Sequence, residues 1–440
     1  MNRIPMRSAI AFAACVAVAG GVMTLSGLAG AGAPAATTDW PQWRGPNRDA
    51  IAAATGLKKT WESAPPKLLW QSSGLGLGFS SMSIVGDRIY TMGDIATDQF
   101  VFALNRANGK ILWKTRIGLP WDDEYPGPRG TPTVDGDRVY ALGSDGDLMC
   151  LDAATGKVRW QKNMDKDYGG RVMTVWKWSE SPLVDGDRLV FSPGGPWAAI
   201  VAVDKMSGKN IWATEMPDLG ARGRDGAGYS SIVISNGGGV KQYVQLMGRG
   251  LMSVRASDGK FLWSYNKIAN NVANIPTPIV SGDHIFTSTG YQTGAALLKL
   301  AKSGDGVSAT EVYFLDAKTF QNHHGGMVLK DGYVYAGHMH NRGFPICIEM
   351  ATGKVVWGGD IRNAGTGSAA VLLADGNLYF RYQNAVMMLI EATPRGYKEK
   401  GSFQIPQPGR AYPSWSHPVV LDGKLYLREQ GNLYVYDVRG

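Results

Sequence analysis

Short runs of alternating apolar and polar residues recur along this chain, and tight glycine turns separate them. The commonest unit is an apolar pair, a Gly-Asp or Asp-Gly turn, and then a β-branched or aromatic run, as at residues 85–90 and 421–426. Alternating runs on both sides of such a turn predict an antiparallel β-hairpin. The unit occurs eight times at spacings of about 44 to 52 residues, with one degenerate copy at residues 237–239. A period of this length predicts a repeat architecture.

A second turn, Gly-Lys, follows most of these hairpins and leads into a strand that ends in tryptophan. Glycine suits this turn because it adopts positive φ without strain. The tryptophans are Trp113, Trp160, Trp212, Trp263 and Trp357. The last two lie 94 residues apart, or two repeats, so one repeat has lost its tryptophan and has Tyr313 near the expected place. Two hairpin turns per repeat predict four antiparallel strands, which is one blade of a β-propeller.

The two ends of the repeat array predict how the ring closes. The last copy stops at residues 434–437, one strand short, and the missing strand is present near the start at residues 67–70. We therefore predict an all-β fold, an eight-bladed β-propeller whose N- and C-terminal strands share the last blade, which leaves no open sheet edge. A β-helix or a pair of β-sandwiches would not explain this divided repeat. The predicted domains are a signal peptide at 1–35, an N-terminal strap at 36–66 and the propeller at 67–440.

Residues 1–35 have the composition of a secretory signal peptide. Arg3 and Arg7 precede a long apolar stretch, and an Ala-Pro-Ala sequence at 33–35 offers a cleavage site. Glycines interrupt the stretch, which makes it a poor permanent anchor, so we expect no transmembrane segment in the mature chain. Cys15 would permit a lipid anchor only after an early cleavage that leaves an apolar tail. The prediction is a periplasmic or secreted protein.

The charge and the cysteines of the chain each exclude one possibility. The formal net charge of +8 becomes +6 without the two arginines of the signal peptide. Basic and acidic residues are interleaved, so no basic run predicts a nucleic-acid groove. The mature chain keeps Cys150 and Cys347, which occupy matching positions in the second and sixth repeats. Opposite blades hold these residues farther apart than the roughly 7 Å between Cα atoms that a disulfide needs, so both are predicted to be free core thiols.

The repeat also resembles known families. Residues 151–160, Leu-Asp-Ala-Ala-Thr-Gly-Lys-Val-Arg-Trp, resemble the tryptophan-docking repeat of quinoprotein dehydrogenases and of the outer-membrane assembly factor BamB. A closer resemblance is to secreted PQQ-like repeat proteins, which open with Trp-Pro-x-Trp-Arg-Gly-Pro, here at 40–46, and share the segments 321–326 and 415–418. This resemblance implies the fold but no particular activity. We interpret the opening segment as a strap whose tryptophans cover apolar surface, with carbohydrate stacking as the alternative.

The resemblance raises the question of pyrroloquinoline quinone (PQQ). Quinoprotein alcohol dehydrogenases typically stack a vicinal Cys-Cys disulfide on this cofactor, and this chain has no adjacent cysteines. It has no Cys-x-x-Cys-His sequence for covalent haem, and the calcium-ligating set of the family cannot be matched by position. These departures argue against PQQ, and the sequence assigns no cofactor. PQQ and a divalent metal ion are kept as alternatives.

Uniform turns are expected on one face of the ring and variable loops on the other. The Gly-Asp and Gly-Lys turns are alike in the repeats, as turn chemistry alone would make them, whereas the links between blades differ, and binding residues tend to sit on such loops. Residues just before the inner strands should converge on the mouth of the central channel. There they would either bind a polar ligand or hydrogen-bond one another and plug the channel. The candidate ligand-binding residues are Arg129, Trp178, Glu180, Arg224, Tyr229, Asn274, His323, His324, Trp415 and His417.

Four of the six histidines fall in the sixth repeat: His323, His324, His338 and His340. The predicted hairpin brings His324 opposite His338, and His338 and His340 are two residues apart, so they are predicted to share a strand face. Imidazoles so placed can hold Zn²⁺ or Cu²⁺. The candidate metal ligands are therefore His324, His338 and His340, with simple hydrogen bonding at strand ends as the alternative.

Two functional hypotheses from different classes follow. The leading hypothesis is a monomeric extracytoplasmic scaffold that binds a protein partner or a polysaccharide through its variable face. It is favoured because the chain has no Ser/His/Asp signature, phosphate loop or standard zinc spacing. The alternative is a PQQ- or metal-dependent oxidoreductase acting on alcohols or sugars, with Glu180, Arg129 and His323 or His324 as its working groups.

Overall fold

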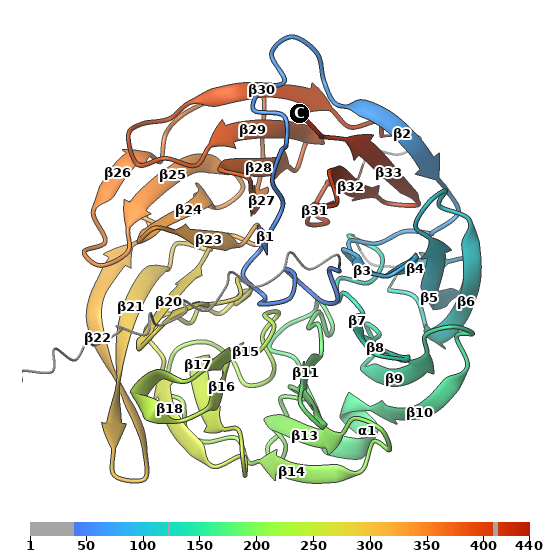
Figure 1. Ribbon diagram of the computed structural model, residues 1–440. Helices are drawn as coiled ribbons and strands as arrows, with labels where there is room; N and C mark the ends of the chain where they lie inside the picture. Colours follow the sequence, from blue (N-terminus) through green and yellow to red (C-terminus); the bar gives the residue numbers. More distant parts are fainter. Residues whose placement is uncertain (1–38, 122–123, 408–411) are drawn as a thin grey trace, which may run out of the picture. The chain divides into compact units, whose positions relative to one another are not determined.

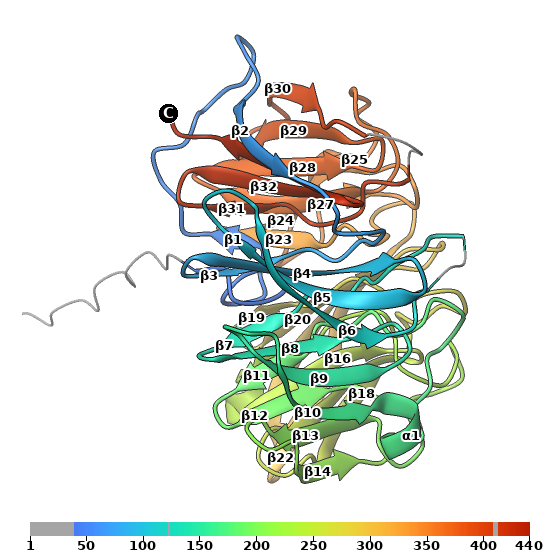
Figure 2. The same ribbon diagram turned by 90° about the vertical axis from the view of Figure 1, so that its right-hand side faces the viewer.

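Eight β-sheets are arranged radially around a central axis in the computed structural model, which describes residues 39–121, 124–407 and 412–440 (Figure 1). Seen from the side, the first three blades lie one beneath another (Figure 2). The predicted eight-bladed β-propeller is confirmed. The predicted signal peptide and Cys15 lie outside the described residues. Within the described ranges, no helix has both the length and the apolar character that crossing a membrane requires.

In the first six blades the four strands follow one another along the chain from the axis outward, in antiparallel order (Figure 1). The first blade consists of β3 (Ser83–Val85), β4 (Arg88–Ile95), β5 (Asp98–Asn105) and β6 (Ile111–Gly118), and the second of β7 (Thr133–Asp135), β8 (Arg138–Leu142), β9 (Asp147–Asp152) and β10 (Val158–Asn163). The third blade consists of β11 (Leu183–Asp185), β12 (Arg188–Phe191), β13 (Ile200–Asp204) and β14 (Asn210–Thr214). The fourth consists of β15 (Val233–Ser235), β16 (Gln242–Met247), β17 (Gly250–Arg255) and β18 (Phe261–Tyr265). Two short helices, α1 (Met164–Tyr168) and η1 (Gly237–Gly239), lie in the connections.

The second half of the ring repeats the same plan. The next three blades are β19 (Ile279–Ser281), β20 (His284–Thr289), β21 (Gly294–Ser303) and β22 (Gly306–Asp316); β23 (Met327–Lys330), β24 (Tyr333–His338), β25 (Phe344–Glu349) and β26 (Val355–Gly358); and β27 (Ala369–Ala374), β28 (Asn377–Tyr382), β29 (Val386–Glu391) and β30 (Glu399–Gln404). The eighth blade is β31 (Val419–Leu421), β32 (Lys424–Glu429), β33 (Asn432–Asp437) and, on its outer edge, β2 (Lys67–Ser72).

Adjacent blades are joined by the tryptophans of the outer strands. The indole Nε1 of Trp113 donates to the carbonyl of Ala153 in the next blade at 3.1 Å. Gly156, which follows the turn beside this ring, has φ +72°, and a Cβ there would lie 2.6 Å from Trp113. Glycine is therefore needed for both the turn and the close approach. Tyr313 replaces the missing tryptophan of the fifth blade and donates its hydroxyl to the carbonyl of Met350 at 2.6 Å.

The two ends of the propeller close the ring in one sheet. β2 pairs antiparallel with β33, with Trp70 opposite Val435, and Figure 1 shows these two strands side by side. The predicted sharing of the last blade is thus confirmed. A side chain also joins the last blade to the first: Arg428 of β32 donates Nη1 to Thr91 Oγ1 at 2.6 Å. This contact is buried.

Two features go beyond the predicted four-stranded repeat. β1 (Ile51–Ala52), from the strap, pairs parallel with β27, so the seventh sheet has five strands. The hairpin of β21 and β22 is long and packs on the fourth blade, where a Cβ on Gly237 would lie 2.6 Å from Leu300 and one on Gly238 would lie 3.0 Å from Val307. This close packing accounts for the degenerate copy of the Gly-Asp turn.

Both cysteines of the propeller are free and buried, as predicted. Cys150 lies opposite Tyr140 in the second blade, and Cys347 lies opposite Tyr335 in the sixth. Burial raises the pKa of both thiols, that of Cys347 to about 12. Both side chains therefore act as small apolar groups of the core.

Candidate functional site

A cavity of about 400 Å³ lies on the axis of the propeller. Its walls come from the segments that precede the inner strands and from the turns between second and third strands, so all eight blades contribute. These are the variable loops of the sequence, and the uniform turns have no part in the lining. Six of the ten candidate residues line the cavity: Arg129, Tyr229, His323, His324, Trp415 and His417.

The N-terminal strap crosses the axis and closes one end of the channel. Trp40 of the strap is buried and exchanges backbone hydrogen bonds with Ile84 at 2.7 and 2.8 Å. Farther along, Arg48 is only 4 % exposed and donates Nη1 to the carbonyl oxygens of Ser181 and Ile232, both at 3.0 Å. These two acceptors precede the inner strands of the third and fourth blades. The channel is therefore blocked by a buried arginine, and the cavity is a pocket with a floor.

Trp43 and Arg44 of the strap belong to the lining of this pocket. Trp43 is half-buried and donates Nε1 to Thr277 Oγ1 at 3.1 Å. Arg44 donates Nη2 to the carbonyl oxygens of Asp49, at 3.2 Å, and of Met327. Burial lowers the pKa of Arg44 to about 10, so the guanidinium stays charged at neutral pH. The expectation that the strap tryptophans cover apolar surface describes Trp40 but not Trp43.

Trp415 is the centre of an aromatic cluster in the pocket. Its ring centroid lies 4.9 Å from that of Phe79, 4.7 Å from Tyr125 and 4.8 Å from His324. Its Nε1 donates to Gln383 Oε1 at 2.9 Å, which fixes the plane of the indole. A flat apolar surface of this kind, held rigidly, is suited to stacking against a ligand ring.

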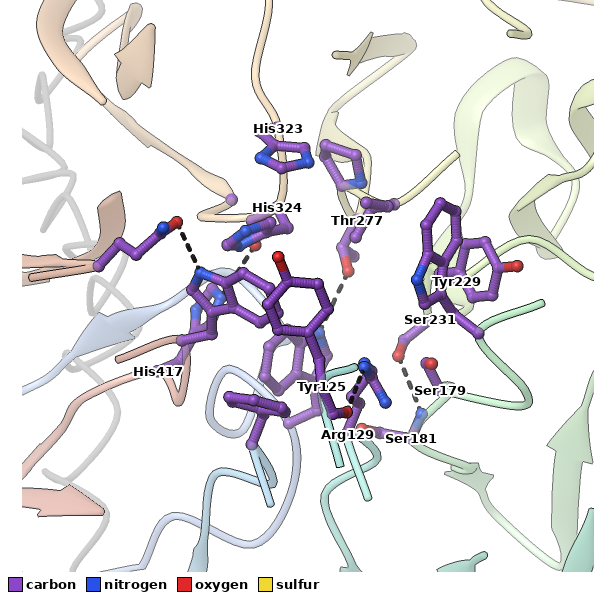
Figure 3. A pocket seen from close by; sticks show the side chains of 18 of the residues that line it. Tyr125, Arg129, Ser179, Ser181, Tyr229, Ser231, Thr277, His323, His324 and His417 are labelled. Atoms are coloured by element: carbon purple, nitrogen blue, oxygen red, sulfur yellow. Dashed lines mark hydrogen bonds between the residues drawn. The ribbon is translucent and has the colours of Figure 1, made fainter. Parts of the chain in front are cut away.

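Hydroxyl groups and a second aromatic pair form another part of the wall. Tyr229 contacts Trp176 edge to face, with ring centroids 5.8 Å apart. Ser181 donates its backbone N–H to Ser231 Oγ at 3.0 Å, and Figure 3 shows both serines near Ser179 and Tyr229. Ser179 Oγ is buried and has no hydrogen-bond partner among the described residues. This side of the pocket therefore presents an unpaired hydroxyl.

Arg129 carries the second guanidinium of the lining. Its Cζ lies 3.7 Å from the ring centroid of Trp121 and 5.4 Å from that of Phe79, which are cation–π distances. Its nitrogens donate to the carbonyl oxygens of Gly127 and Tyr125 at 3.1 and 3.0 Å. The side chain is thus fixed in place, and its charge lies at the pocket.

Three histidines of the sixth blade share one wall. The ring of His323 lies 4.3 Å from that of His324 and 4.1 Å from that of His340. His323 pairs both nitrogens, with Ser368 Oγ at 2.7 Å and Tyr291 Oη at 3.0 Å, whereas His324 Nε2 and His340 Nδ1 are buried without partners among the described residues. Burial lowers the pKa of His324 to about 3, and that of His340 is lowered for the same reason. These imidazoles are therefore neutral at physiological pH.

The structure separates one of the three candidate metal ligands, His338, from the other two, His324 and His340, which both line the pocket. His338 accepts the backbone N–H of Gln321 at its Nδ1, at 3.2 Å, and is not part of the pocket lining. Met339, between the two strand-end histidines, has φ +66°, which breaks the alternation of side chains along a strand. His338 and His340 consequently do not share a face. Across the ranges that the structure describes, no three His, Cys, Asp or Glu residues are placed to hold a metal ion.

A residue with positive φ also accounts for the position of Trp178, which lies outside the pocket. Lys177 has φ +59°, so Trp176 enters the pocket while Trp178 packs in the core between the second and third blades. Asn274 is fully buried and donates to the carbonyl oxygens of residues 247 and 248 at 3.0 and 2.9 Å. Arg224 is exposed and lies outside the lining. These three candidate residues therefore do not face the pocket.

Glu180 also lies outside the lining, buried in the wall of the channel. It is 3 % exposed, and its Oε2 accepts the backbone N–H of Ser192 at 2.8 Å. Burial raises its pKa to about 8, opposed by the nearby positive charge of Arg48. A catalytic role for Glu180 on a substrate in the pocket does not fit this position.

Some lining residues were not candidates from the sequence. Tyr125 and Trp176 lie four residues before Arg129 and Glu180, so a wider window before each inner strand would have found them. Tyr291 enters from the turn after β20, where it has φ +55°. No sequence pattern predicts that turn conformation.

Comparison with known proteins gives the relationship of the chain. Residues 97–359, more than half of the 440, match the family described as "Outer membrane protein assembly factor BamB". Among curated proteins, the assembly factor BamB of Burkholderia pseudomallei (strain K96243) is 27% identical over 172 residues, which are 38% of this chain and 39% of that protein. The 1-butanol dehydrogenase (quinone) of Thauera butanivorans is 32% identical over 130 residues, 26% of this chain and 20% of that protein. The matched segments thus span about two fifths or less of these relatives.

Solved structures with the same fold include members of both groups. BamB from Moraxella catarrhalis aligns with a TM-score of 0.58 at 14% identity and covers 85% of this chain and 98% of its own. A europium-containing methanol dehydrogenase aligns with a TM-score of 0.65 at 12% identity, over 91% of this chain and 98% of that chain. At such low identity these two likenesses establish the architecture alone. On the family match, the chain belongs to the PQQ-type repeat propellers of the BamB family.

Proposed function

We propose that this chain is an extracytoplasmic, monomeric scaffold that binds a polysaccharide in its axial pocket and catalyses no reaction. The observation that supports this most is the lining of the pocket, where aromatic rings alternate with polar groups around a concave site of about 400 Å³. Ligand sites are commonly cavities of roughly 300–1,000 Å³ with a few polar groups set among apolar walls. The pocket has the size and the composition of such a site.

Aromatic and polar groups match the two kinds of surface on a sugar ring. The C–H face of a sugar stacks on a flat ring such as that of Trp415 or Tyr125. Its hydroxyl edge needs donors and acceptors, which the unpaired Ser179 Oγ, His324 Nε2 and His340 Nδ1 supply. A neutral imidazole offers one donor and one acceptor. Since an unpaired buried polar group costs about 1–3 kcal/mol, a hydroxylated ligand gains by pairing these atoms.

The BamB relatives favour a protein partner instead, because BamB of Burkholderia pseudomallei is an outer membrane protein assembly factor. A protein would have to insert a side chain or a chain end into the pocket. The candidate residues line a cavity and not a flat patch, so a polysaccharide is the ligand that we propose. Capture of a protein is the result that would replace it.

The dehydrogenase relatives favour an oxidoreductase instead. This alternative requires ligand atoms for a cofactor and its metal ion in the lining of the pocket. The resemblance to quinoprotein dehydrogenases implies that PQQ would be held together with a calcium ion, which takes six to eight oxygen ligands from carboxylates, amide and backbone carbonyls and water. Among the described lining residues the only carboxylate is that of Glu124, which is exposed. The lining does not fit that ion, and we derive no redox step for this chain.

A glycan array and a pull-down from envelope extract test the proposal. Trp415→Ala removes the central ring of the pocket, and Trp197→Ala, which removes a tryptophan that is 51% exposed and outside the lining, is the matched control. We expect polysaccharide binding by the wild type and by Trp197→Ala, and affinity weaker by about tenfold for Trp415→Ala.

Three other results would count against a polysaccharide scaffold. A blank array together with reproducible capture of one envelope protein would establish the protein-binding alternative. Equal binding by both tryptophan variants would move the site away from the pocket. A rise in melting temperature and dye reduction with PQQ and Ca²⁺ would establish the oxidoreductase.

A further inference from the structure

We infer that the polysaccharide contains a uronic acid unit and that Arg44 of the strap binds the carboxylate of this unit. The inference rests on the proposed function and narrows its ligand class. Two positively charged groups, the guanidinium groups of Arg44 and Arg129, belong to the lining of the pocket. The carboxylate of Glu124 is the only acidic group among the described lining residues. The lining therefore favours an anion.

Arg44 has one donor that the protein does not use. Its Nε donates to the carbonyl of Arg48 at 3.3 Å, and its Nη2 donates to the carbonyls of Asp49 and Met327. Its Nη1 is buried and has no partner among the described residues, although the side chain is only 4 % exposed. Most buried side-chain nitrogens have at least one hydrogen-bond partner, since an unpaired one is costly. An acceptor from outside the protein would complete this set.

The chain leaves room for Nη1 at the pocket. Gly326, also in the lining, has φ +74°, and a Cβ there would lie 2.0 Å from Arg44 Nη1 and 3.3 Å from His417 Cε1. Any other residue at 326 would displace the guanidinium. Glycine at this position therefore allows the arginine to sit beside His417 at the floor.

Among the described residues, no carboxylate neutralises Arg44 by direct contact. Asp49 is the acidic residue whose charge acts on Arg44, yet its Oδ1 accepts the backbone N–H of Ile51 at 3.0 Å. Within the described part of the chain, Arg44 forms no ion pair within 4.0 Å. By contrast, the buried Arg381 forms an ion pair with Glu429 at 2.7 Å. A ligand carboxylate would supply for Arg44 what Glu429 supplies for Arg381.

A carboxylate alone would not use the rest of the lining. The unpaired Ser179, His324 and His340 atoms suit hydroxyl groups, and the neutral imidazoles add no charge that would attract a second anion. The ring of Trp415 suits a sugar face. A ring that carries one carboxylate and several hydroxyl groups, which is a hexuronic acid, uses all three kinds of contact.

The test compares uronic acids with neutral copies of the same sugars. Trisaccharides of galacturonic, glucuronic and mannuronic acid, and their carboxyl-reduced counterparts, are titrated calorimetrically into the wild-type protein. We expect at least one acid to bind ten times or more tightly than its reduced counterpart, as loss of a charge-assisted hydrogen bond would give. Arg44→Met should abolish this preference. Arg44→Lys should retain part of it, because the charge remains but the planar donor set is lost.

Two further variants test the role of Arg44 in binding the acid even if Arg44→Met does not fold. Gly326→Ala keeps the arginine but displaces Nη1, and it should reduce the preference for the acid. Arg116→Met, which removes an arginine of β6 that is 55% exposed and outside the lining, should leave it unchanged. Equal affinity for every acid and its reduced counterpart would overturn this inference while leaving the proposed function standing. Failure of all glycans on the array to bind would overturn both.

Discussion

Replacement of Glu180 by glutamine is expected to remove a pH dependence of folding stability. Glu180 is 3 % exposed and accepts the backbone N–H of Ser192 at 2.8 Å. Burial raises its pKa from 4.5 to about 8, although Arg48 lies nearby. The carboxyl group is therefore uncharged in the folded protein at neutral pH, whereas it is ionised in the unfolded chain.

The sign and the size of the effect follow from this difference in pKa. Because the folded state of Glu180 holds its proton more tightly, the group contributes its full stabilisation below pH 4.5 and loses it as the pH rises toward 8. At about 1.36 kcal/mol for each pKa unit, the limiting effect is roughly 5 kcal/mol. Roughly 3–4 kcal/mol of this is lost between about pH 5 and pH 8. Glutamine has nearly the same shape and cannot ionise, so residue 180 of the variant makes no pH-dependent contribution to the free energy of unfolding.

Urea denaturation at pH 5 and at pH 8 measures the difference. The free energy of unfolding of Glu180→Gln, relative to the wild type, should rise by roughly 3–4 kcal/mol from the lower to the higher pH. Other titrating groups are common to both proteins and cancel in this comparison. Glu215→Gln, at an exposed position, is the control and should show no such change. Parallel pH profiles for the wild type and Glu180→Gln would refute the reasoning.

Three shorter predictions concern the repeats and the thiols. Trp357→Ala should lower the free energy of unfolding by about 3–5 kcal/mol in urea denaturation, because the ring is buried and docks the next blade. Gly156→Ala should cost more than Gly136→Ala in the same assay; both have positive φ, but only the Cβ at 156 meets a tryptophan ring. Equal losses would contradict that account. Cys150 and Cys347 should react with a thiol reagent only after unfolding, as followed by mass spectrometry; a native-state disulfide would show the blade assignment to be wrong.

The repeat pattern predicts most of the fold because turns and strand alternation are local properties. Eight hairpin turns, the position of Tyr313 and the sharing of the last blade all follow from spacing along the chain, and the structure has each of them. The parallel pairing of β1 with β27 and the long hairpin over the fourth blade do not follow. Both depend on contacts between segments far apart in the chain, which no local pattern encodes.

The site is predicted in position but not in detail. The rule that residues before each inner strand converge on the axis places His323 and Trp415 correctly. It fails for Trp178 because Lys177, with positive φ, turns that side chain away from the predicted face. The separate prediction that His338 and His340 share a strand face fails for the same reason, because Met339 between them has positive φ. The rule does not identify Arg44 either, because this residue lies in the strap, whose path across the axis depends on hydrogen bonds to distant blades. The repeat pattern therefore predicts neither the residues with positive φ nor the contacts that the strap makes with distant blades.

A crystal structure of the protein saturated with its tightest acidic trisaccharide tests the account most directly. The account predicts sugar density on the axis, one ring stacked on Trp415 and its carboxylate hydrogen-bonded to Arg44 Nη1. Sugar bound on the outer strands or on the face of the uniform turns, with the axial pocket filled only by water, would contradict it.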